Sequence, residues 1–381
     1  MKIAIFSFDI DRAYGTGNIT YELCVELYKK GVDFTLFLPQ INNRDGKPNS
    51  EKCVGFPFTI KCVMPPYVSG LGEMIKKKLI VQYLKTYNLK DFTLVHCLFE
   101  FPHSFITARS AKKNKLPFIM GAQGTYGVLP LTKSARPFLK WSYSQAKEII
   151  VPSQFTKEMI NKYAGENYPI SIIHNGVNFS RFEKAPDISD LREKYKGQKI
   201  LLTVGGLIPR KGQDLVIRAL PKVVAKHSSV KYILAGTGRM LEPWQKMAES
   251  LGLANRVEFL GRVEADDVNR WFHFCDIYVH TPIVVNLSFE GFGIVYIEAS
   301  ACGKPIVASD AGGIRDAIIE GKTGLIARDR NINDIADKII KLLDSEDLRR
   351  QMGEAGRQYA KEHDWSIITD KFIEKYKQYS L

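Results

Sequence analysis

Short runs of apolar, often β-branched residues alternate with longer amphipathic stretches along most of this 381-residue chain. This alternation is typical of parallel β-strands joined by crossover helices, which is the α/β class of fold. The pattern stops at a charged segment, residues 187–198, and then starts again. A chain of this length also suits two domains of roughly 150–200 residues each better than a single core. We therefore predict two Rossmann-like domains, each with its own parallel sheet.

The predicted strands of the first domain are residues 2–8, 33–38, 93–97, 118–122, 148–151 and 170–173, with a helix at 18–30. Those of the second domain are residues 199–204, 231–235, 256–260, 277–280, 305–308 and 324–326. Residues 366–381 have the spacing of an amphipathic helix that could pack on either domain. The predicted domains are thus 1–178, 179–365 and the terminal helix 366–381, for which packing back on the N-terminal domain is one option. Because ligands bind at the carboxyl ends of the strands in such sheets, we expect a ligand cleft between the domains.

Apolar content and cysteine usage limit the class of protein. The chain offers no uninterrupted run of about 18 apolar residues for a membrane span, and its apolar N-terminus meets acidic residues without a cleavage site. The cysteines form no CxxC pair, which indicates reduced thiols and neither a disulfide framework nor a metal site. They are Cys24, Cys53, Cys62, Cys97, Cys275 and Cys302. We therefore expect a cytoplasmic protein.

Positive charge is concentrated in the first half of the chain. Of the formal net charge of +13, residues 1–175 carry +10, from 23 Lys and Arg against 13 Asp and Glu, and the remainder carries +3, from 31 against 28. The basic runs at 76–78 and 112–115, with Lys133, Arg136 and Lys140, could attract an anionic membrane surface or a phosphate-bearing acceptor. They could equally form a solvated face. Nucleic acid is not expected, because no aromatic residues that would stack on bases are interleaved with the basic ones.

The segment around the first predicted turn carries two motifs that bind phosphates or metals in other proteins. Gly15 and Gly17 precede a helix whose amides could receive a phosphate or a sugar hydroxyl, or could simply form a tight turn. A dinucleotide fingerprint would need a third glycine at Thr20 and an acidic residue after the second strand, so NAD is not expected. Asp9 and Asp11 are similar to a metal-binding DxD pair, but two carboxylates alone are a poor site for a divalent cation, and we expect no metal.

Two adjacent cations follow the first strand of the second domain. Gly206 belongs to a flexible turn, and Arg210 and Lys211 stand just before the next predicted helix. Charge-assisted hydrogen bonds from such residues to a diphosphate contribute about 1.5–3 kcal/mol each. A diphosphate site is the functional interpretation, and a solvent-exposed basic pair is the alternative.

The most informative stretch is residues 290–298. Glu290 stands in a glycine-rich loop with Gly291, Phe292 and Gly293, and Glu298 falls inside the helix that follows. The loop amides could hold phosphate and sugar, and the two carboxylates could accept hydrogen bonds from hydroxyls. The alternative is that Glu290 is an ordinary charge at a helix N-terminus and Glu298 a solvated one.

Taken together, these segments resemble the family-4 (group 1) retaining glycosyltransferases of the GT-B fold, from the Gly15 turn to about Ala327. Further landmarks stand in the order of that family: Val95-His96, Gly124-Thr125, residues 149–153, residues 174–178, Lys211-Gly212, the glutamate pair, residues 303–305 and Gly312-Gly313. The resemblance implies two facing Rossmann-like domains with parallel sheets and an interdomain cleft. It also implies transfer from a nucleotide-sugar to a carbohydrate or lipid-linked acceptor, in cell-surface polysaccharide or glycolipid synthesis, without a metal cofactor.

The resemblance also implies roles for individual residues. Glu290 would lie against the donor sugar, Glu298 would bind the ribose, and Lys211 with Arg210 would neutralise the diphosphate. Glu290, Lys211 and Arg210 are thus the expected catalytic residues. Donor contacts are further implied for Gly15, Gly17, Gly206, Arg262, Val263, Gly291, Phe292 and Gly293.

Three positions depart from the family pattern. The usual arginine is Gly206 here, a common histidine is Gln123, and a common aspartate is Asn178. Arg210 could replace the arginine missing at Gly206. Gln123 removes a candidate proton carrier, and we keep it as an acceptor-side residue together with His96, for which a satisfied core histidine is the alternative.

Members of this family are thought to react by front-face attack, with the leaving diphosphate accepting the proton of the acceptor. Positioning and charge stabilisation would then dominate, and no strong general base is needed. Two other functions stay open. One is a sugar-nucleotide epimerase on the same fold, which needs no acceptor, and the other is a non-catalytic sugar-nucleotide-binding protein.

Overall fold

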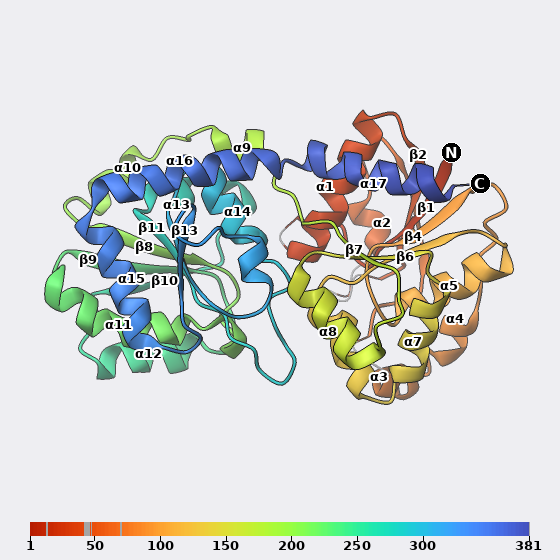
Figure 1. Cartoon of the computed structure of the whole chain (residues 1–381), viewed down its shortest axis with the longest axis horizontal. Helices are drawn as coiled ribbons and strands as arrows, with labels where there is room; N and C mark the ends of the chain where they lie inside the picture. The colour runs from red at the N-terminus through yellow and green to blue at the C-terminus, as the bar shows by residue number, and fades with distance from the viewer. Residues whose placement is uncertain (13, 42–45, 47, 69–70, 381) are drawn as a thin grey trace. The chain divides into compact units, whose positions relative to one another are not determined.

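The chain folds into two compact units in the computed structural model, which describes residues 1–12, 14–41, 46, 48–68 and 71–380 (Figure 1). Unit 1 consists of Met1–Asn175 and Trp365–Leu381, and unit 2 consists of Gly176–Asp364. Each unit holds one parallel sheet with helices packed around it. The predicted class, α/β with two Rossmann-like domains, is confirmed. The boundaries predicted at 178 and 365 lie close to those of the units.

Unit 1 is built on a sheet whose seven described strands follow the order β3-β2-β1-β4-β5-β6-β7, all parallel. They are β1 (Lys2–Phe6), β2 (Asp33–Pro39), β3 (Thr59–Met64), β4 (Leu94–Cys97), β5 (Phe118–Gly121), β6 (Glu148–Val151) and β7 (Ile170–Ile172). The order reverses between β1 and β4, which is where sheets of this kind bind ligands at their carboxyl edge.

Strand β3 was missing from the prediction, which gave the first domain six strands. It lies at the edge of the sheet, beside β2 alone, and only Met64 of its residues is fully buried. Its exposed positions are Thr59, Lys61 and Val63, so its sequence lacks the continuous apolar run of the inner strands. An edge strand needs less burial, and periodicity alone gives it a weaker signal.

The helices of unit 1 cover both faces of this sheet. They are α1 (Gly15–Lys29), α2 (Asn49–Lys52), α3 (Leu71–Lys76), α4 (Ile80–Leu84), α5 (His103–Lys113), α6 (Thr125–Val128), η1 (Leu129–Thr132), α7 (Arg136–Gln145), α8 (Gln154–Ala164) and α17 (Trp365–Tyr379). Helix α1 begins at Gly15, earlier than the predicted start at residue 18. A Cβ atom on Gly17 would lie 2.2 Å from the backbone oxygen of Asp11, so this turn of the helix requires glycine.

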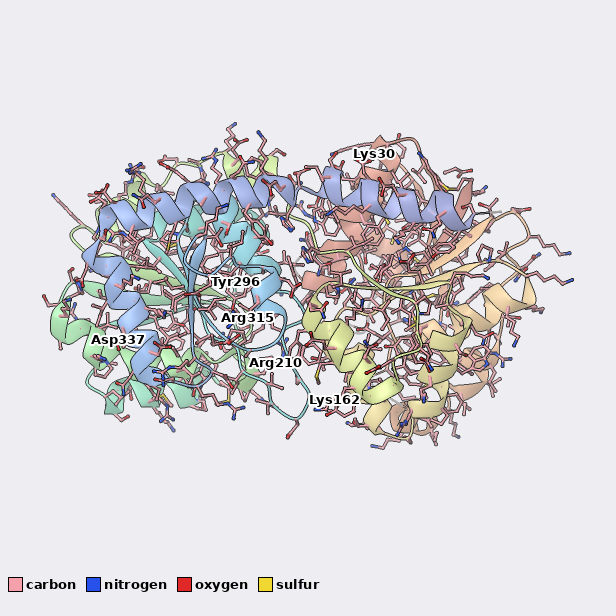
Figure 2. All side chains as sticks on the ribbon, viewed as in Figure 1. Lys30, Lys162, Arg210, Tyr296, Arg315 and Asp337 are labelled. Carbon is pink, nitrogen blue, oxygen red and sulfur yellow. The ribbon has the colours of Figure 1, made fainter. Side chains whose placement is uncertain are left out.

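The C-terminal helix α17 belongs to unit 1, which settles the choice that the sequence left open. It packs against α1 (Figure 1) and buries Trp365 and Phe372. An ion pair joins Lys30, labelled in Figure 2, to Asp370 at 2.9 Å. Helix α17 is therefore part of the core of the unit that begins the chain.

Unit 2 holds a parallel sheet whose six described strands follow the order β10-β9-β8-β11-β12-β13. They are β8 (Lys199–Val204), β9 (Val230–Ala235), β10 (Val257–Gly261), β11 (Ile277–His280), β12 (Ile306–Ser309) and β13 (Gly324–Ala327). Successive residues face opposite sides, so Leu201 packs into one apolar cluster and Leu202 into the other. Burial on both sides explains why these strands could be predicted from apolar runs.

Helices cover both faces of the second sheet as well. They are α9 (Phe179–Glu183), α10 (Ser189–Lys194), η2 (Pro209–Lys211), α11 (Gln213–Lys226), α12 (Leu241–Ser250), α13 (Ala265–Phe274), α14 (Ile294–Ala301), η3 (Gly313–Asp316), α15 (Ile332–Asp344) and α16 (Glu346–Glu362). Side-chain caps start three of them. At the start of α9, Asn178 Oδ1 accepts the backbone N–H of Arg181 at 3.2 Å. Asn331 Oδ1 accepts the backbone N–H of Asp334 at 2.9 Å, and Ser345 Oγ accepts that of Leu348 at 3.1 Å.

All six cysteines are free thiols, four of them buried and two, Cys53 and Cys62, partly exposed. Among the described residues, no helix combines the length and the apolar character that crossing a bilayer requires.

Candidate functional site

Two loops of unit 2 meet at the point where the order of its sheet reverses. Strands β8 and β11 are neighbours, while the strands that follow each of them in the chain lie on opposite sides. The loop after β8 carries Arg210 and Lys211, and the loop after β11 carries Glu290. The carboxyl ends of the two strands lie at the same edge because the strands are parallel. The sheet therefore brings together three residues that the sequence predicted as catalytic.

These three side chains form one cluster, which we call the ion triad. Lys211 Nζ lies 2.6 Å from Glu290 Oε2, and Arg210 Nη1 lies 3.1 Å from the same oxygen. The Lys211 side chain is 15% exposed and that of Glu290 is 16% exposed, so water screens the contacts only partly. Arg210, labelled in Figure 2, is somewhat more accessible. The triad is thus a partly buried group with two cations and one carboxylate.

The protonation state of the triad is set by its own charges. Burial alone would raise the pKa of Glu290, but the positive charges of Lys211 and Arg210 outweigh it and hold the pKa well below its usual range. Burial lowers the pKa of Lys211, and the carboxylate of Glu290 opposes that shift. Near neutral pH the triad therefore keeps its carboxylate ionised and carries a net positive charge.

Backbone contacts fix the loop after β8 to the loop after β11. The backbone N–H of Ile283 donates to the carbonyl of Arg210 at 2.8 Å, and the hydroxyl of Thr281 donates to the carbonyl of Gly212 at 2.8 Å. Gly212 has a φ of +66°, and a Cβ atom there would collide with the carbonyl oxygen of Thr281. The glycine after Lys211 is therefore required for the close approach that sets the triad.

The loop after β12 supports Glu290 from the other side. The backbone N–H of Gly313 donates to the Glu290 carbonyl at 2.8 Å. Gly312 has a φ of +74°, and a Cβ atom there would lie 2.5 Å from the same carbonyl oxygen. The Gly312-Gly313 pair that the sequence offered only as a family landmark thus holds the backbone of Glu290. Arg315, which follows in η3, is labelled in Figure 2.

His280 is a residue of this region that sequence reasoning missed. It ends β11, its side chain is fully buried, and burial followed by the charge of Lys211 lowers its pKa to about 3. Its ring lies 5.5 Å from that of Tyr296, whose hydroxyl donates to the His280 carbonyl at 2.9 Å. Neither ring nitrogen has a hydrogen-bond partner among the described residues. The sequence offered one signal for His280 as a site residue, which is its place at the carboxyl end of β11.

The other predicted donor residues of unit 2 lie in the loops that follow the strands of the sheet or in the helix α14. Glu298 is half-buried in α14, and its charge is one of the influences, after burial, that raise the pKa of Tyr278. Phe292 is buried against His363, so only its backbone is available to a ligand. Arg262 and Val263 follow β10, which is separated from β8 by β9.

Gly206 is exposed in the loop directly after β8. A Cβ atom there would approach nothing nearer than the carbonyl oxygen of Thr237, at 3.7 Å. The loop therefore has room for a side chain at the position where the resembling family carries arginine.

The predicted residues of unit 1 fall into two environments. Gly15 and Gly17 form the first turn of α1. His96 lies in the core, where its Nδ1 and the hydroxyl of Tyr376 in α17 share a hydrogen bond of 2.8 Å. Burial lowers the pKa of His96 to about 3, so it stays neutral. His96 is therefore a core histidine that joins the sheet to α17, and the structure does not support it as a residue that contacts an acceptor.

Gln123 lies at the carboxyl edge of the sheet of unit 1, just after β5. Its backbone N–H donates to Glu100 Oε1 at 3.0 Å, and its side-chain oxygen accepts from Asn175 Nδ2 at 3.2 Å. Both partners also come from loops at the carboxyl edge, after β4 and β7. Gln123 is thus held in place by two neighbouring loops.

Asp9 has a structural use in the same unit. Its Oδ1 accepts the backbone N–H groups of Ile10 at 2.8 Å and of Asp11 at 3.0 Å, which shapes the loop after β1. Across the described residues, no group of three or more His, Cys, Asp or Glu side chains is placed to hold a metal ion.

Each half of the chain matches one known family of glycosyltransferases. Residues 13–181 match the family described as Glycosyltransferase Family 4, and residues 185–359 match the one described as Glycosyl transferases group 1. The two matches correspond closely to the first part of unit 1 and to unit 2.

Individual relatives agree with these matches. An uncharacterised glycosyltransferase of Methanocaldococcus jannaschii is 29% identical over 71% of this chain and 71% of its own length. A GDP-mannose-dependent alpha-(1-6)-phosphatidylinositol monomannoside mannosyltransferase of Mycolicibacterium smegmatis is 31% identical over 63% of this chain and 63% of its own length. The match therefore spans slightly less than two thirds of the mycobacterial enzyme.

Solved structures share the fold over almost the whole chain. Anabaena HepE, crystallised with UDP and glucose, superposes with a TM-score of 0.77 at 21% identity and covers 99% of both chains. A glycosyltransferase of Rickettsia africae superposes with a TM-score of 0.76 at 20% identity and covers 99% of this chain and 98% of its own. At sequence identities of 20–21%, these superpositions show that the chains share a fold.

Proposed function

This chain belongs to the family-4 (group 1) glycosyltransferases of the GT-B fold, and from that premise we propose that it transfers a sugar from a nucleoside-diphosphate-sugar to an acceptor with retention of anomeric configuration. The observation that carries the proposal is the ion triad at the reversal point of the sheet in unit 2. A diphosphate is the part of a nucleotide-sugar that such a group of cations would recognise.

The two cations supply leaving-group stabilisation. Breaking the bond between the anomeric carbon and the phosphate oxygen builds negative charge on the diphosphate. Arg210 presents a planar fork of donors, and Lys211 a point charge in a largely buried position, where its interactions are stronger than in water. Both are oriented before the donor binds, because each already contacts Glu290. Preorganised charge of this kind lowers the barrier without a strong general base.

Glu290 has a second role in this scheme. Both cations contact its Oε2, so we assign its Oε1 to a hydroxyl of the donor sugar. The carboxylate stays ionised because Lys211 and Arg210 hold its pKa below the usual range in spite of burial. It can therefore accept a hydroxyl hydrogen bond and stabilise positive charge that develops at the anomeric carbon.

The remaining donor contacts follow the same loop into α14. Gly291 and Gly293 lie directly before that helix, where backbone N–H groups and the helix dipole favour a phosphate. We assign Glu298, in the helix itself, to the ribose hydroxyls. Since Arg210 and Lys211 already provide positive charge for the diphosphate, we propose that transfer needs no divalent cation.

The acceptor is proposed to be a carbohydrate or a lipid-linked sugar, used in cell-surface polysaccharide or glycolipid synthesis at the cytoplasmic face of a membrane. The mycobacterial relative is described as acting on a phosphatidylinositol monomannoside, which is a glycolipid. The segment 75–84 of this chain has a suitable surface, with Ile75 59% exposed and Val81 65% exposed. The exposed lysines of residues 76–78 lie between them. Apolar side chains flanked by lysines are typical of a surface that binds anionic lipid.

Liposome sedimentation tests the membrane part of the proposal. The protein should sediment with vesicles that contain phosphatidylglycerol and much less with vesicles of phosphatidylcholine alone. Val81→Glu should reduce binding, whereas Val54→Glu, at another exposed apolar position of unit 1, should not. Equal partitioning into both kinds of vesicle at moderate salt would contradict an anionic surface.

Donor binding tests the central proposal. A thermal-shift panel of UDP-, GDP-, ADP- and TDP-sugars without added metal should raise the unfolding midpoint for one nucleotide, because a ligand of the folded state stabilises it. Lys211→Ala and Glu298→Ala should lose the shift. Lys222→Ala is the matched control, since Lys222 pairs with the exposed Asp337, which is labelled in Figure 2. No selective shift from any nucleotide would refute the assignment.

Product analysis separates transfer from the two alternatives. A glycosyltransferase gives a glycosylated acceptor and a nucleoside diphosphate. An epimerase would release an altered sugar without an acceptor, and a non-catalytic protein would bind the donor without turnover. Chelation of divalent cations should leave transfer unchanged, and loss of activity that added Mg²⁺ restores would contradict the metal-independent mechanism.

A further inference from the structure

Two cysteines of unit 1 that lie nine positions apart in the chain meet in the fold. Cys53 ends the short helix α2, and Cys62 lies in the edge strand β3. Their Sγ atoms are 3.9 Å apart and share a weak S–H···S hydrogen bond. A disulfide bond is about 2 Å long, so the two sulfurs would have to approach by roughly 2 Å to form one. We call these two residues the thiol pair.

The thiol pair is open to a reagent from solvent. Cys53 and Cys62 are both partly exposed, whereas the other four cysteines are buried. The turn that follows Cys53 is open, with Val54 81% exposed. In β3, Cys62 falls between the exposed Lys61 and Val63. A small molecule can therefore reach this pair of sulfurs in the folded protein.

The connection that carries α2 is fixed at both ends. At its start, the buried Asn49 donates from Nδ2 to the carbonyl of Pro39 at 2.9 Å. At its end, Phe58 packs against Phe34 with ring centres 5.1 Å apart. Both contacts are made to β2, which is the neighbour of β3 in the sheet. They keep the thiol pair together, and groups held together in this way react with each other more readily than with separate molecules.

The two thiols differ in acidity. Burial raises the pKa of Cys53 to about 12. Burial also raises the pKa of Cys62, but the hydrogen bond with Cys53 opposes that rise. Both sulfurs are therefore protonated at neutral pH. The thiolate is the form that attacks a disulfide, and it is reached more readily at Cys62.

We propose that the thiol pair is a site of reversible oxidation, at which a low-molecular-weight disulfide converts Cys53 and Cys62 into an intramolecular disulfide bond. The Cys62 thiolate attacks one sulfur of the small disulfide, whose S–S bond breaks, and the first small thiol leaves with the proton that Cys62 has lost. The Cys53 sulfur then attacks the Cys62 sulfur of the mixed disulfide. The second small thiol leaves with the proton of Cys53. The two cysteines lose two electrons and two protons in all, and the small disulfide takes up both as it becomes two thiols.

The new bond would join α2 to β3 covalently. It would fix the connection between β2 and β3 to the edge of the sheet, and it would stabilise unit 1 because a cross-link lowers the entropy of the unfolded chain. A small thiol in excess would reverse it by the same exchange. The site goes beyond the proposed function, since it uses no residue of the ion triad.

Oxidation of the full chain by glutathione disulfide tests the proposal. Intact mass should show the loss of two hydrogen atoms, and peptide mapping should place the bond between Cys53 and Cys62. The unfolding midpoint should rise by several degrees and return after treatment with dithiothreitol. Cys275→Ser is the control and should leave the bond unchanged. Cys275 is buried in unit 2 and donates to the Phe272 carbonyl at 3.3 Å, a contact that serine can also make.

Single serine variants separate the roles of the two sulfurs. In Cys53→Ser the second step is blocked, so a mixed disulfide with glutathione should accumulate at Cys62. In Cys62→Ser the attacking sulfur is gone, and several-fold less glutathione should be attached at Cys53. The rate of oxidation of the original protein should still be rising at about pH 9.5, above the usual pKa of a thiol.

Three outcomes would overturn the proposal. They are glutathione adducts without a bond between Cys53 and Cys62, formation of that bond only in urea, and equal oxidation of all six cysteines. The first would mean that the two sulfurs cannot approach each other, and the other two would mean that the folded protein does not offer the site. Unfolding midpoints show whether each variant is folded. If a serine variant does not fold, the mapped bond in the original protein still decides.

Discussion

Lys211 Nζ and Glu290 Oε2 lie 2.6 Å apart although 79 positions separate the two residues in the chain. The contact joins the loop after β8 to the loop after β11 at the reversal point of the sheet in unit 2. Lys211 and Arg210 both contact the Glu290 carboxylate before any ligand arrives. An incoming diphosphate must therefore share these two cations with Glu290.

Removing either member of the contact should remove most of the turnover. We expect Lys211→Ala and Glu290→Ala each to lower kcat about 10²–10³-fold, as for other preorganised electrostatic groups. Transfer assays with the selected nucleotide-sugar measure this, and Lys222→Ala serves as a charge-matched control. Near-normal turnover in both variants would contradict the role of the triad.

An arginine at Gly206 should strengthen donor binding. A Cβ atom at this position meets nothing nearer than 3.7 Å, and a guanidinium added four positions before Arg210 would give the diphosphate a further cation. We expect Gly206→Arg to lower the Kd for the nucleoside diphosphate about tenfold, which corresponds to roughly 1.4 kcal/mol. Isothermal titration measures the effect.

The control for this variant is Gly72→Arg, which adds the same charge in open space on unit 1. An unchanged Kd in Gly206→Arg would show that Arg210 already supplies the contact that the family's arginine makes.

Alanine at Gly312 should disturb Glu290 through the backbone. The Cβ atom would lie 2.5 Å from the Glu290 carbonyl oxygen, and the φ of +74° disfavours any side chain. We expect Gly312→Ala to lower the free energy of unfolding by about 1–3 kcal/mol and to lower turnover as well. Denaturant unfolding and a transfer assay measure the two effects.

Gly303 separates the effect of the positive φ from the effect of the contact with Glu290. Its φ of +71° is nearly the same as that of Gly312, but the nearest atom to a Cβ there would lie 3.9 Å away. Gly303→Ala should therefore cost less stability than Gly312→Ala and leave turnover intact. Equal losses in both variants would mean that φ alone, and not the contact with Glu290, decides the effect.

Glu100 should make the stability of the protein depend on pH. Burial raises the pKa of this carboxyl from 4.5 to about 7, against the opposing hydrogen bond from the Gln123 N–H. The folded state thus holds a proton that the unfolded state releases, so the free energy of unfolding falls as pH rises from 4.5 to 7. The loss amounts to about 3 kcal/mol and is complete above pH 7.

Glu100→Gln should remove this dependence. The difference in free energy of unfolding between Glu100→Gln and the original protein should shift in favour of the variant between pH 5 and pH 7 and then stay constant. Unfolding midpoints measured over that range test this. Glu166→Gln, at an exposed position, makes the same change of charge and should not show the trend. A constant difference between Glu100→Gln and the original protein at all pH values would refute the prediction.

Much of the fold could be predicted because most strands are buried on both faces. Strands such as β8 and β11 then appear as continuous apolar runs, and parallel strands place the loops that follow them at one edge. That reasoning placed the loop of Arg210 and Lys211 after a strand, but only the family resemblance grouped these two residues with Glu290. It could not find β3, which is half-exposed, or decide where α17 packs, because an amphipathic pattern shows that one face is buried and not what covers it.

The remainder of the site depends on contacts that no local pattern carries. His96 looked like a ligand-side residue because it ends a strand, but Tyr376 of the distant helix α17 makes it a core residue. Likewise, the distance between Gly312 and Glu290 depends on how two loops lie against each other.

The place of α17 has a consequence for how the protein is made. Unit 1 contains Met1–Asn175, yet Trp365, Phe372 and Tyr376, which are buried in its core, follow all of unit 2 in the chain. During translation the first segment of unit 1 must wait for α17 until all of unit 2 has been synthesised. The core of unit 1 is therefore completed only after the whole of unit 2 has been made, and a fragment cut after residue 175 would lack the apolar side chains with which α17 packs against α1.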